Sequence, residues 1–463
     1  MTADTETYGY LPEERPDTFK LILYAIQQVI VMFPATITVA LITGFQVSTT
    51  IFASGLATLC FTFITGGKIP LYYGSSFAYL SAVASMAAAE GTPEQLAAWE
   101  ATGILPTELI SKAQFGIIMS GFVSIAAGLI VRKFGKEAVE KILPPSITGP
   151  ISMIIGLTLA GNALGDAVSA EPGAFGSAWL VVSLVTLLST IFYSKYLKGF
   201  LGQIPLLLGA ATGCAAAALI LLIGGVDLNL FRSISDESLN SLWSAGPLAI
   251  PAFSLPTFSM TSLFAIMPIA IATIPESTAH MYQLDIYVND VAKKKGKKLG
   301  YSLIDLLDRN LIGDGLCDMI SGLVGGPAGT NYGENISTMA ITRVFSVSVL
   351  RVAAVFAMIV SCFTPLIKVI YGIPLAVIGG LEVYLFGAIA AQGIAIMIDK
   401  RVDMFSSRNI AVIAAIMVIG LGGQYTFGGN IPFFGLSVPC VAGASIFGIV
   451  LNALLSIGEQ DAA

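Results

Sequence analysis

Fourteen apolar segments, most of them long enough to cross a lipid bilayer, constrain this chain more than any other feature of its sequence. A membrane-spanning helix needs about 20 mostly apolar residues. Only 11% of the 463 residues are charged, whereas soluble domains contain about 25%. We therefore expect an all-α polytopic membrane protein. The segments lie near residues 20–43, 45–66, 70–88, 112–132, 144–165, 175–194, 202–225, 261–284, 304–324, 328–342, 346–368, 372–397, 408–427 and 432–457.

The loops between these segments differ in their content of Lys and Arg. Cytoplasmic loops of membrane proteins carry the excess of basic residues. If the N-terminus is cytoplasmic, that side collects the basic clusters at 132–141, 195–198, 293–298 and 400–408. An even number of segments places both termini on the same side. The expected location is the inner (cytoplasmic) membrane, crossed many times and surrounded by lipid, with both termini in the cytoplasm.

Residues 325–343, GGPAGTNYGENISTMAITR, do not fit an ordinary membrane helix although they lie among the apolar segments. Their first half is rich in Gly, Pro and polar residues. Non-helical backbone at membrane depth is tolerated only where protein buries it or where it lines a water-filled site. The stretch also contains Glu334, and a carboxylate at this depth is costly enough to mark a functional site.

Two short motifs recur at an offset of seven segments. Residues 73–76, YGSS, in the third segment correspond to 332–335, YGEN, in the tenth, and residues 143–149, LPPSITG, correspond to 373–379, IPLAVIG. Because seven is odd, the second half would enter the membrane in the opposite orientation. Inverted repeats of this kind are typical of secondary transporters, whose substrate lies near the midplane between interrupted segments. We expect the third and tenth segments each to begin extended, to continue as half a helix, and to cross at the substrate site.

A second polar pair lies in the eighth segment. Glu276 and His280 are four residues apart, so they share one face of a helix. His280 is the only histidine of the chain, and histidine changes charge near physiological pH. The pair either holds helices together or takes part in proton-linked transport. The cost of two polar groups on one face of an apolar helix favours transport.

If Glu276 and Glu334 share one buried site, both cannot ionise cheaply, and at least one should hold a proton. A protonated carboxyl both donates and accepts hydrogen bonds, whereas an ionised carboxylate only accepts them. Such a pair suits a neutral planar ligand with alternating N–H and C=O groups, and it does not suit an anion. Protons are then the natural coupling ion.

The residues around Glu334 also match a known pattern. Glu334, Asn335, Thr342 and Arg343 follow the order of an acidic or amide residue, then Asn, then Thr-Arg seven and eight positions after the Asn. This pattern resembles the signature of the nucleobase/ascorbate transporter family (nucleobase:cation symporter-2), and the chain is most similar to the bacterial uracil permeases of that family. The resemblance extends over almost the whole chain. The signature usually has Gly two positions after the Asn, where this chain has Ser337.

Two further stretches support the resemblance. Residues 74–78, GSSFA, resemble the third-segment strand of the family. Residues 27–28, QQ, followed by MF at 32–33 and TG at 43–44, resemble its first segment. Many relatives have Gln-His at these two positions. In this chain Gln28 replaces the histidine, so the first segment lacks the group that could carry a proton there.

The resemblance implies a seven-plus-seven inverted fold with two domains. A core domain would comprise residues 1–143 and 259–370, holding segments 1–4 and 8–11. A gate domain would comprise residues 144–258, with segments 5–7 and an outer connector, and residues 371–463, with segments 12–14. The implied function is a proton-coupled nucleobase symporter that imports uracil, not an enzyme, with no cofactor besides the coupling proton. A homodimer is suggested by the family alone.

The resemblance also implies which residues form the site. Substrate-binding residues carried over by motif are Glu276, Glu334, Phe77, Gly333, Tyr332 and Phe386. The carboxyl groups would hydrogen-bond the edge of the base, and the main chain at Phe77 and Gly333 would complete the polar contacts. His280 and Glu276 would couple the proton to the substrate. Phe386 stands where uracil-type relatives commonly have Tyr, and it would cover the ring.

Other ligand classes stay open at this point. A purine permease for xanthine, urate or guanine belongs to the same family, and those relatives often carry Gln at the position of Glu334, so Glu favours a pyrimidine. An anion transporter of similar seven-plus-seven fold would bind sulfate or bicarbonate at helix N-termini, and the paired carboxylates argue against it. The sequence contains no metal-type spacing, and a net charge of −6 argues against nucleic acid as a partner.

Acidic residues also occur within the ninth and twelfth apolar segments. Glu382, in the twelfth segment, is either a third proton-linked carboxylate or a gate residue bonded to a neighbouring helix. Asp314 and Asp318 are four residues apart in the ninth segment. We interpret this pair as structural contacts that support the tenth segment.

Overall fold

The computed structural model describes residues 9–135, 137–169, 173–224, 230–232, 234, 239, 243–433 and 436–457. In this part of the chain, nine helices are long and apolar enough to cross a membrane, as expected of a multi-pass membrane protein. Both chain ends, one residue of the basic cluster at 132–141, the end of the segment at 202–225 and much of the outer connector at 228–258 lie outside the described residues.

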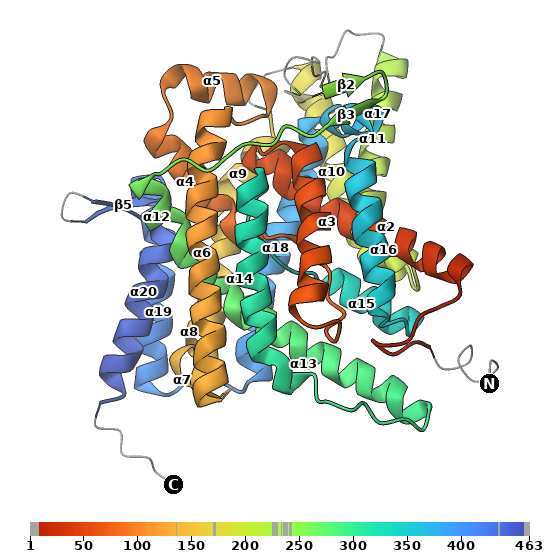
Figure 1. The fold of residues 1–463 in the computed structure, drawn as a ribbon. Helices are drawn as coiled ribbons and strands as arrows, with labels where there is room; N and C mark the ends of the chain where they lie inside the picture. The colour runs from red at the N-terminus through yellow and green to blue at the C-terminus, as the bar shows by residue number, and fades with distance from the viewer. Residues whose placement is uncertain are drawn as a thin grey trace.

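Two groups of helices, which alternate along the chain, make up the molecule (Figure 1). The first group consists of α2 (Thr18–Thr43), α3 (Val47–Ile64), α4 (Leu80–Glu90), α6 (Thr107–Phe134), α12 (Met260–Ile266), α13 (Ala270–Lys294), α14 (Leu307–Val324), α15 (Gly333–Thr342) and α16 (Val347–Ser361). Within it α14 packs against α6 and α3, and α16 packs against α3 and α2. Helices from the two halves of the sequence therefore form one bundle.

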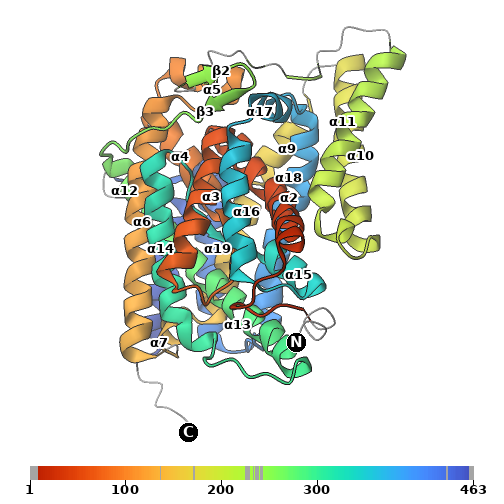
Figure 2. The same ribbon diagram turned by 45° about the vertical axis from the view of Figure 1, so that its right-hand side comes forward.

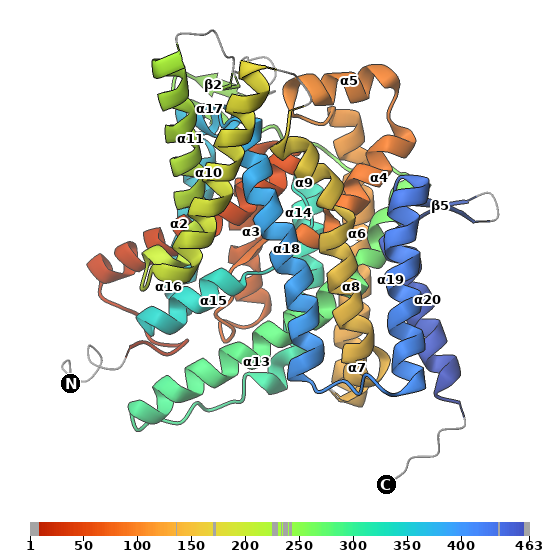
Figure 3. The ribbon, with the colours of Figure 1, turned by 180° about the vertical axis from the view of Figure 1, so that it is seen from behind.

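The second group is built around one long helix. It consists of α8 (Pro145–Thr158), α9 (Ala160–Ala167), α10 (Ala174–Tyr196), α11 (Pro205–Gly224), α18 (Leu375–Asp399), α19 (Ser407–Phe427) and α20 (Cys440–Leu455). Helix α18 packs against α8, α9, α10 and α11, and Figure 3 shows it beside α8. The α10–α11 pair lies at the edge of the molecule, at the right of Figure 2.

Short elements complete the fold. They are α5 (Pro93–Thr102), α7 (Glu137–Ile142), α17 (Thr364–Tyr371), the strands β1 (Tyr73–Ser75), β2 (Trp243–Ala245), β3 (Leu248–Ile250), β4 (Gly329–Asn331), β5 (Asn430–Phe433) and β6 (Leu436–Pro439), and the 3-10 turns η1 (Phe77–Tyr79), η2 (Leu201–Gln203), η3 (Met267–Ile269) and η4 (Ile304–Leu306). The strands form the two-stranded sheets β1–β4, β2–β3 and β5–β6. The apolar pattern alone does not indicate α5, which has no buried residue.

The third and tenth apolar segments cross as an antiparallel pair of strands, with Tyr73 opposite Asn331. Glycine makes this crossing possible because a Cβ on Gly74 would lie 2.2 Å from the ring of Tyr332. A Cβ on Gly329 would lie 2.5 Å from the main-chain oxygen of Gly74. Each strand then leads into a helix, β1 through η1 into α4, and β4 into α15. The crossing therefore aims the starts of two short helices at the centre of the molecule.

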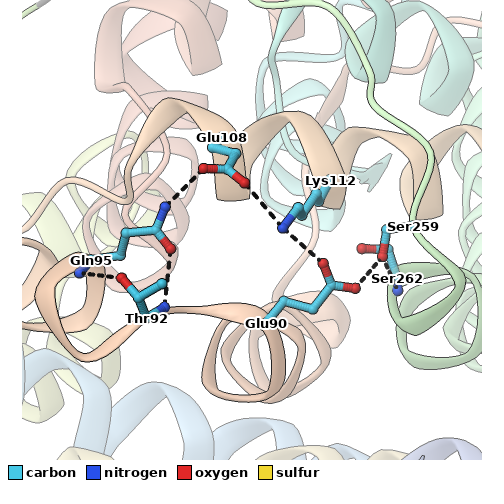
Figure 4. A network of polar contacts seen from close by, with 7 residues as sticks. All are labelled: Glu90, Thr92, Gln95, Glu108, Lys112, Ser259 and Ser262. Atoms are coloured by element: carbon cyan, nitrogen blue, oxygen red, sulfur yellow. Dashed lines mark hydrogen bonds and ion pairs between the residues drawn. The ribbon is translucent and has the colours of Figure 1, made fainter.

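A polar network ties α5 to its neighbours at one end of the molecule (Figure 4). The Gln95 side chain donates to Glu108 at 3.0 Å. Lys112 pairs with Glu108 at 3.2 Å and with Glu90 at 3.1 Å, and Glu90 accepts from the hydroxyl of Ser259 at 2.5 Å. Because isolated surface ion pairs contribute little to stability, the significance of these contacts lies in the elements that they connect. This network links α4, α5 and α6 to the segment that precedes α12.

A second network holds the segment before α2 against the end of α13. Glu14 accepts hydrogen bonds from Lys295 at 2.5 Å and from Lys297 at 2.7 Å. Burial alone would raise the pKa of Glu14, but the hydrogen bonds from both lysines outweigh it, and the pKa lies below its ordinary value of 4.5. The carboxylate is therefore more stable in the folded protein than in water.

Candidate functional site

A cavity of about 260 Å³ lies between the β1–β4 crossing, α13 and α18. Apolar walls with a few polar groups are typical of a site for a small molecule. Its lining residues are Ser75, Ser76, Phe77, Ala78, Ser152, Ile155, Ala272, Pro275, Glu276, Ala279, His280, Thr330, Asn331, Tyr332, Gly333, Glu334, Leu385, Ala388, Ile389, Gln392 and Ile396. The structure thus brings six of the seven sequence-predicted site residues to one cavity.

Helix α13 contributes Glu276 and His280 to the cavity wall. Their spacing of four residues places both on the same face of this helix. The imidazole of His280 hydrogen-bonds the main chain of Asn331. Its Nδ1 has no hydrogen-bond partner among the described residues, so one nitrogen remains for a ligand, a water molecule or a proton.

Helix α15 begins at the cavity, with Gly333 and Glu334 in its first turn. The first N–H groups of a helix have no partner within the helix, and its N-terminus carries partial positive charge. Glu276 and Glu334 line the same cavity, so two carboxyl groups border one small space. A Cβ at Gly333 would lie 3.0 Å from Nε2 of His280. The glycine therefore allows the imidazole to approach the start of α15.

The Tyr332 side chain supports the crossing rather than offering its hydroxyl to a ligand. Its oxygen lies 2.9 Å from Oγ1 of Thr36 and donates to the main-chain oxygen of Ser75 at 3.0 Å. The ring stacks on Tyr72 with 6.5 Å between the centroids. Tyr332 therefore joins α2, β1 and the start of α15 next to the cavity.

The structure does not bring Phe386 to the cavity. Phe386 is 2% exposed and packs in an apolar cluster with residues such as Val39, Leu80 and Leu159. The α18 residues that line the cavity are Leu385, Ala388, Ile389, Gln392 and Ile396. These positions recur every three or four residues along one helix face, and Phe386 lies on the neighbouring face. The motif match alone could not distinguish adjacent positions of a helix.

Gln392 is a cavity residue that the sequence interpretation missed. It is the polar side chain that α18 presents to the cavity. Its amide can both donate and accept hydrogen bonds. The available signal was a single amide in an otherwise apolar stretch, AIAAQGIAIM, at 388–397.

The acidic residues of α14 hold the strand crossing in place. Asp318 accepts from the hydroxyl of Tyr73 and from the main-chain N–H of Gly329, the latter at 2.8 Å. Asp314 accepts from the side-chain amide of Asn331 at 2.9 Å. Both strands are thus bonded to α14, in agreement with the interpretation of the two aspartates as structural contacts.

The cavity extends toward the end of the molecule that carries Lys400. A neighbouring cavity of about 370 Å³ shares Pro275, Ala279 and Ile396 with it and is also lined by Asp399 and Lys400. The two cavities are therefore neighbours along α13 and α18, on the side of the strand crossing that faces this end.

Ser337, the departure from the family signature, lies outside this route. It lines a third cavity, of about 280 Å³, that reaches Glu334 from the side of α2 and α11. Glu334 therefore borders two cavities, and Ser337 borders the one that does not contain Glu276 or His280.

Metal ligands are not gathered at this site. In the described ranges, no group of three or more His, Cys, Asp or Glu side chains is arranged to hold a metal ion.

Comparison with known proteins agrees with the sequence motifs. A model described as "Permease family" matches residues 19–429. The uracil permease of Bacillus caldolyticus is 35% identical over 455 residues, which cover 97% of this chain and 95% of that protein. The chain belongs to the nucleobase/ascorbate transporter family. The family prediction is thereby confirmed, and membership of a permease family indicates a transporter.

Two other members are similar over nearly their whole length. The uracil permease of Bacillus subtilis (strain 168) is 33% identical over 457 residues, covering 97% of this chain and 95% of that one. The putative pyrimidine permease RutG of Escherichia coli (strain K12) is 33% identical over 462 residues, covering 98% of this chain and 94% of that one.

Two solved structures of other transporters share the fold. One is the transmembrane domain of a cyanobacterium bicarbonate transporter, BicA, with a TM-score of 0.57, 15% identity and coverage of 95% of this chain and 99% of that chain. The other is murine Solute Carrier 26 family member A9, with a TM-score of 0.63, 13% identity and coverage of 96% and 69%. At these identities the likeness concerns the fold alone.

Proposed function

We propose that this protein is a proton-coupled symporter that imports uracil across the cytoplasmic membrane. The observation that carries the proposal is the position of Glu276 and Glu334, which come from two helices and line one cavity. No Lys or Arg is among the described residues that line this cavity. The uracil permeases among its relatives support the same substrate.

A neutral nucleobase fits the chemistry of this wall. Uracil is planar and presents N–H donors and C=O acceptors along one edge. Carboxyl oxygens of Glu276 and Glu334 would accept from the N–H groups, and unpaired main-chain N–H groups near Phe77 and Gly333 would donate to the C=O groups. Gln392 on α18 would contact the ligand from the opposite wall. Because Phe386 packs elsewhere, Leu385 and Ile389 would cover the ring.

Proton coupling follows from the repulsion between the two carboxylates. Glu334 repels Glu276, so a proton on one of them removes an unfavourable interaction. A base that binds more tightly to the protonated pair would in turn favour proton binding to the same extent, because coupling between two ligands is reciprocal. His280 would pass the proton or stabilise its transfer, since Nδ1 has no partner in the part of the chain described.

The two helix groups would move relative to each other during transport. The first group, with residues 1–143 and 259–370, would be the core that carries the substrate, and the second, with 144–258 and 371–463, would be the gate. We assign fourteen segments in a seven-plus-seven inverted repeat, with both termini and the Lys400 end in the cytoplasm. The extension of the cavity toward Lys400 supports an inward-facing state.

A purine base such as xanthine is the nearest alternative substrate, and it is distinguished by competition. Purified protein in liposomes, with an acidic exterior, should accumulate labelled uracil. Unlabelled uracil should abolish this uptake, and xanthine at the same concentration should not. Uptake that xanthine blocks more effectively than uracil would contradict the pyrimidine assignment. An anion is disfavoured because it would face both carboxylates without a basic partner in the cavity.

A further inference from the structure

A pair of carboxyl groups lies in the second helix group, away from the cavity that holds Glu276 and Glu334. The carboxyl groups of Asp166, near the end of α9, and of Glu382, in the first half of α18, lie within reach of each other. Glu382 is only 1% exposed. Its Oε2 has no hydrogen-bond partner among the residues that the structure describes. The sequence left the partner of Glu382 open, and the structure identifies it as Asp166.

The helices approach closely at this pair. A Cβ on Gly379 would lie 2.3 Å from the carbonyl carbon of Asp166. The indole of Trp179 donates to the main-chain oxygen of Asp166 at 2.8 Å and fixes the end of α9. The two acidic side chains are thus held together by the packing of α9 on α18.

This contact requires a bound proton. Ionised carboxylates are hydrogen-bond acceptors only, so two of them cannot bond to each other unless one is protonated. Two buried negative charges in contact would also repel strongly. Two buried carboxyl groups that lie this close would therefore share at least one proton.

Among the residues that the structure describes, few other titratable groups face this pair. Helix α8 carries none, and α11 carries Cys214. Helix α10 carries Tyr193, Lys195 and Tyr196 near its far end, where Tyr193 bonds to Thr212 at 2.9 Å. Among the described residues, the charged group that acts on the pair is Arg232, which attracts Asp166 without forming a direct ion pair.

Arg232 connects this pair to the first helix group. A Cβ on Gly103, where α5 ends, would lie 2.0 Å from an Nη atom of Arg232. Arg232 also interacts with the hydroxyl of Tyr371, which accepts from the N–H of Val47 at 3.0 Å. Arg232 therefore lies between Asp166 of the second group and α5, α17 and α3, at the end of the molecule opposite Lys400.

We propose that Asp166 and Glu382 form a second proton-binding site, separate from the substrate cavity, that controls closure of the outer end through Arg232. When Asp166 is ionised, it attracts Arg232 and holds the two helix groups together. When the pair takes up a proton from outside, the attraction falls and the outer end opens. This inference rests on the proposed transport function and adds a second point at which external pH acts.

Two variants of the pair should act in opposite directions on uracil uptake into liposomes. Glu382→Gln leaves Asp166 ionised, because the amide donates to it, and uptake should fall by about fivefold or more at every external pH. Asp166→Asn removes the charge that holds Arg232, and uptake should persist at alkaline external pH, where the wild-type protein slows. Glu94→Gln, on the exposed face of α5, is the matched control and should follow the wild type.

The same experiment can overturn the inference. If Glu382→Gln and Asp166→Asn both reproduce the wild-type dependence on external pH, the pair is not a proton site. If sodium raises the melting temperature of the wild type at fixed pH and Glu382→Gln removes that effect, the pair binds a metal cation instead. Wild-type protein that shows no uracil uptake would refute the proposed function rather than the carboxyl pair.

A stability measurement tests the pair without transport. If the folded pair holds a proton that the unfolded chain releases at neutral pH, as proposed, stability should fall as pH rises. The melting temperature of the detergent-solubilised wild type should therefore decrease with pH more steeply than that of Glu382→Gln. Equal slopes would contradict a proton held between Asp166 and Glu382.

Discussion

The side-chain amide of Asn335 donates to both oxygens of Gln28, to the main-chain oxygen at 3.0 Å and to Oε1 at 2.7 Å. Asn335 is fully buried and Gln28 is 2% exposed. This contact ties α15 to α2 directly after Glu334. The signature asparagine thus acts as a positioning residue for the carboxylate, and Gln28 serves as its acceptor where many relatives have histidine.

Asn335→Ala should destabilise the protein and weaken uracil binding together. The substitution leaves Oε1 of Gln28 buried without its donor, which costs about 1–3 kcal/mol. Melting curves in detergent, with and without uracil, measure both effects. Asn289→Ala removes an exposed amide of α13 that bonds to Asp285 and should change neither. An Asn335→Ala protein with wild-type stability and affinity would show that the contact does not position Glu334.

Gly74→Ala should disrupt the strand crossing. The new methyl group would lie 2.2 Å from the Tyr332 ring, which is itself held by two hydrogen bonds. Overpacking of this kind costs about 1–3 kcal/mol, and here it displaces the start of α15. We expect a lower melting temperature and loss of ligand-induced stabilisation. Gly387→Ala on α18, where a Cβ meets nothing within 4 Å, should be neutral. A stable, uracil-binding Gly74→Ala protein would refute this account of the crossing.

The strand crossing illustrates what the sequence can and cannot show. Glycine and proline at 325–329 and the repeated Tyr-Gly motif indicate a break in two membrane segments, because helix propensity is a local property. The family motif at Glu334 and Asn335 likewise indicates the site. The pairing of Tyr73 with Asn331 depends on contacts across more than 250 residues, and the sequence alone does not specify the register.

Helix α14 shows a different limit. It is not among the nine described helices that are long and apolar enough to cross a membrane, because it contains four charged residues, Asp308, Arg309, Asp314 and Asp318. Asp314 and Asp318 are buried and bonded to the strands of the crossing. A hydropathy average therefore misses a buried helix when the acidic side chains of that helix are hydrogen-bonded by other segments. Phe386 and Gln392 illustrate the same point on α18, where only packing decides which face meets the cavity.

Glu14→Gln should change the response of stability to acid. The pKa of Glu14 lies below 4.5 in the folded protein, so its contribution to stability is complete above pH 4.5 and is lost as pH falls through the folded value. The wild type should melt at a higher temperature than the variant at pH 7, and the two curves should converge below pH 4.5. Glu94→Gln, on exposed α5, should show no such convergence. A constant difference between Glu14→Gln and the wild type at all pH values would contradict the ion-pair explanation.

His280→Ala should affect proton-driven uptake more than equilibrium binding. The imidazole lines the cavity and its Nδ1 lacks a partner among the described residues, which suits transfer of a proton rather than a permanent contact with the base. Binding of uracil by calorimetry and uptake under an imposed pH gradient separate the two effects. Full response of the variant to the pH gradient would rule out a coupling role for His280.

Glu276 and Glu334 together define the proposed uracil site. Calorimetry of uracil binding to detergent-purified protein tests this assignment most directly. The wild type and Glu94→Gln should bind uracil with equal affinity. Glu334→Ala should weaken uracil binding by about tenfold or more, because it removes a hydrogen-bonding charge worth about 1.5–3 kcal/mol and leaves N–H groups of the base unpaired. Folding of the variant is checked by its melting temperature. Uracil binding of wild-type affinity in a folded Glu334→Ala protein would contradict the assignment of the site.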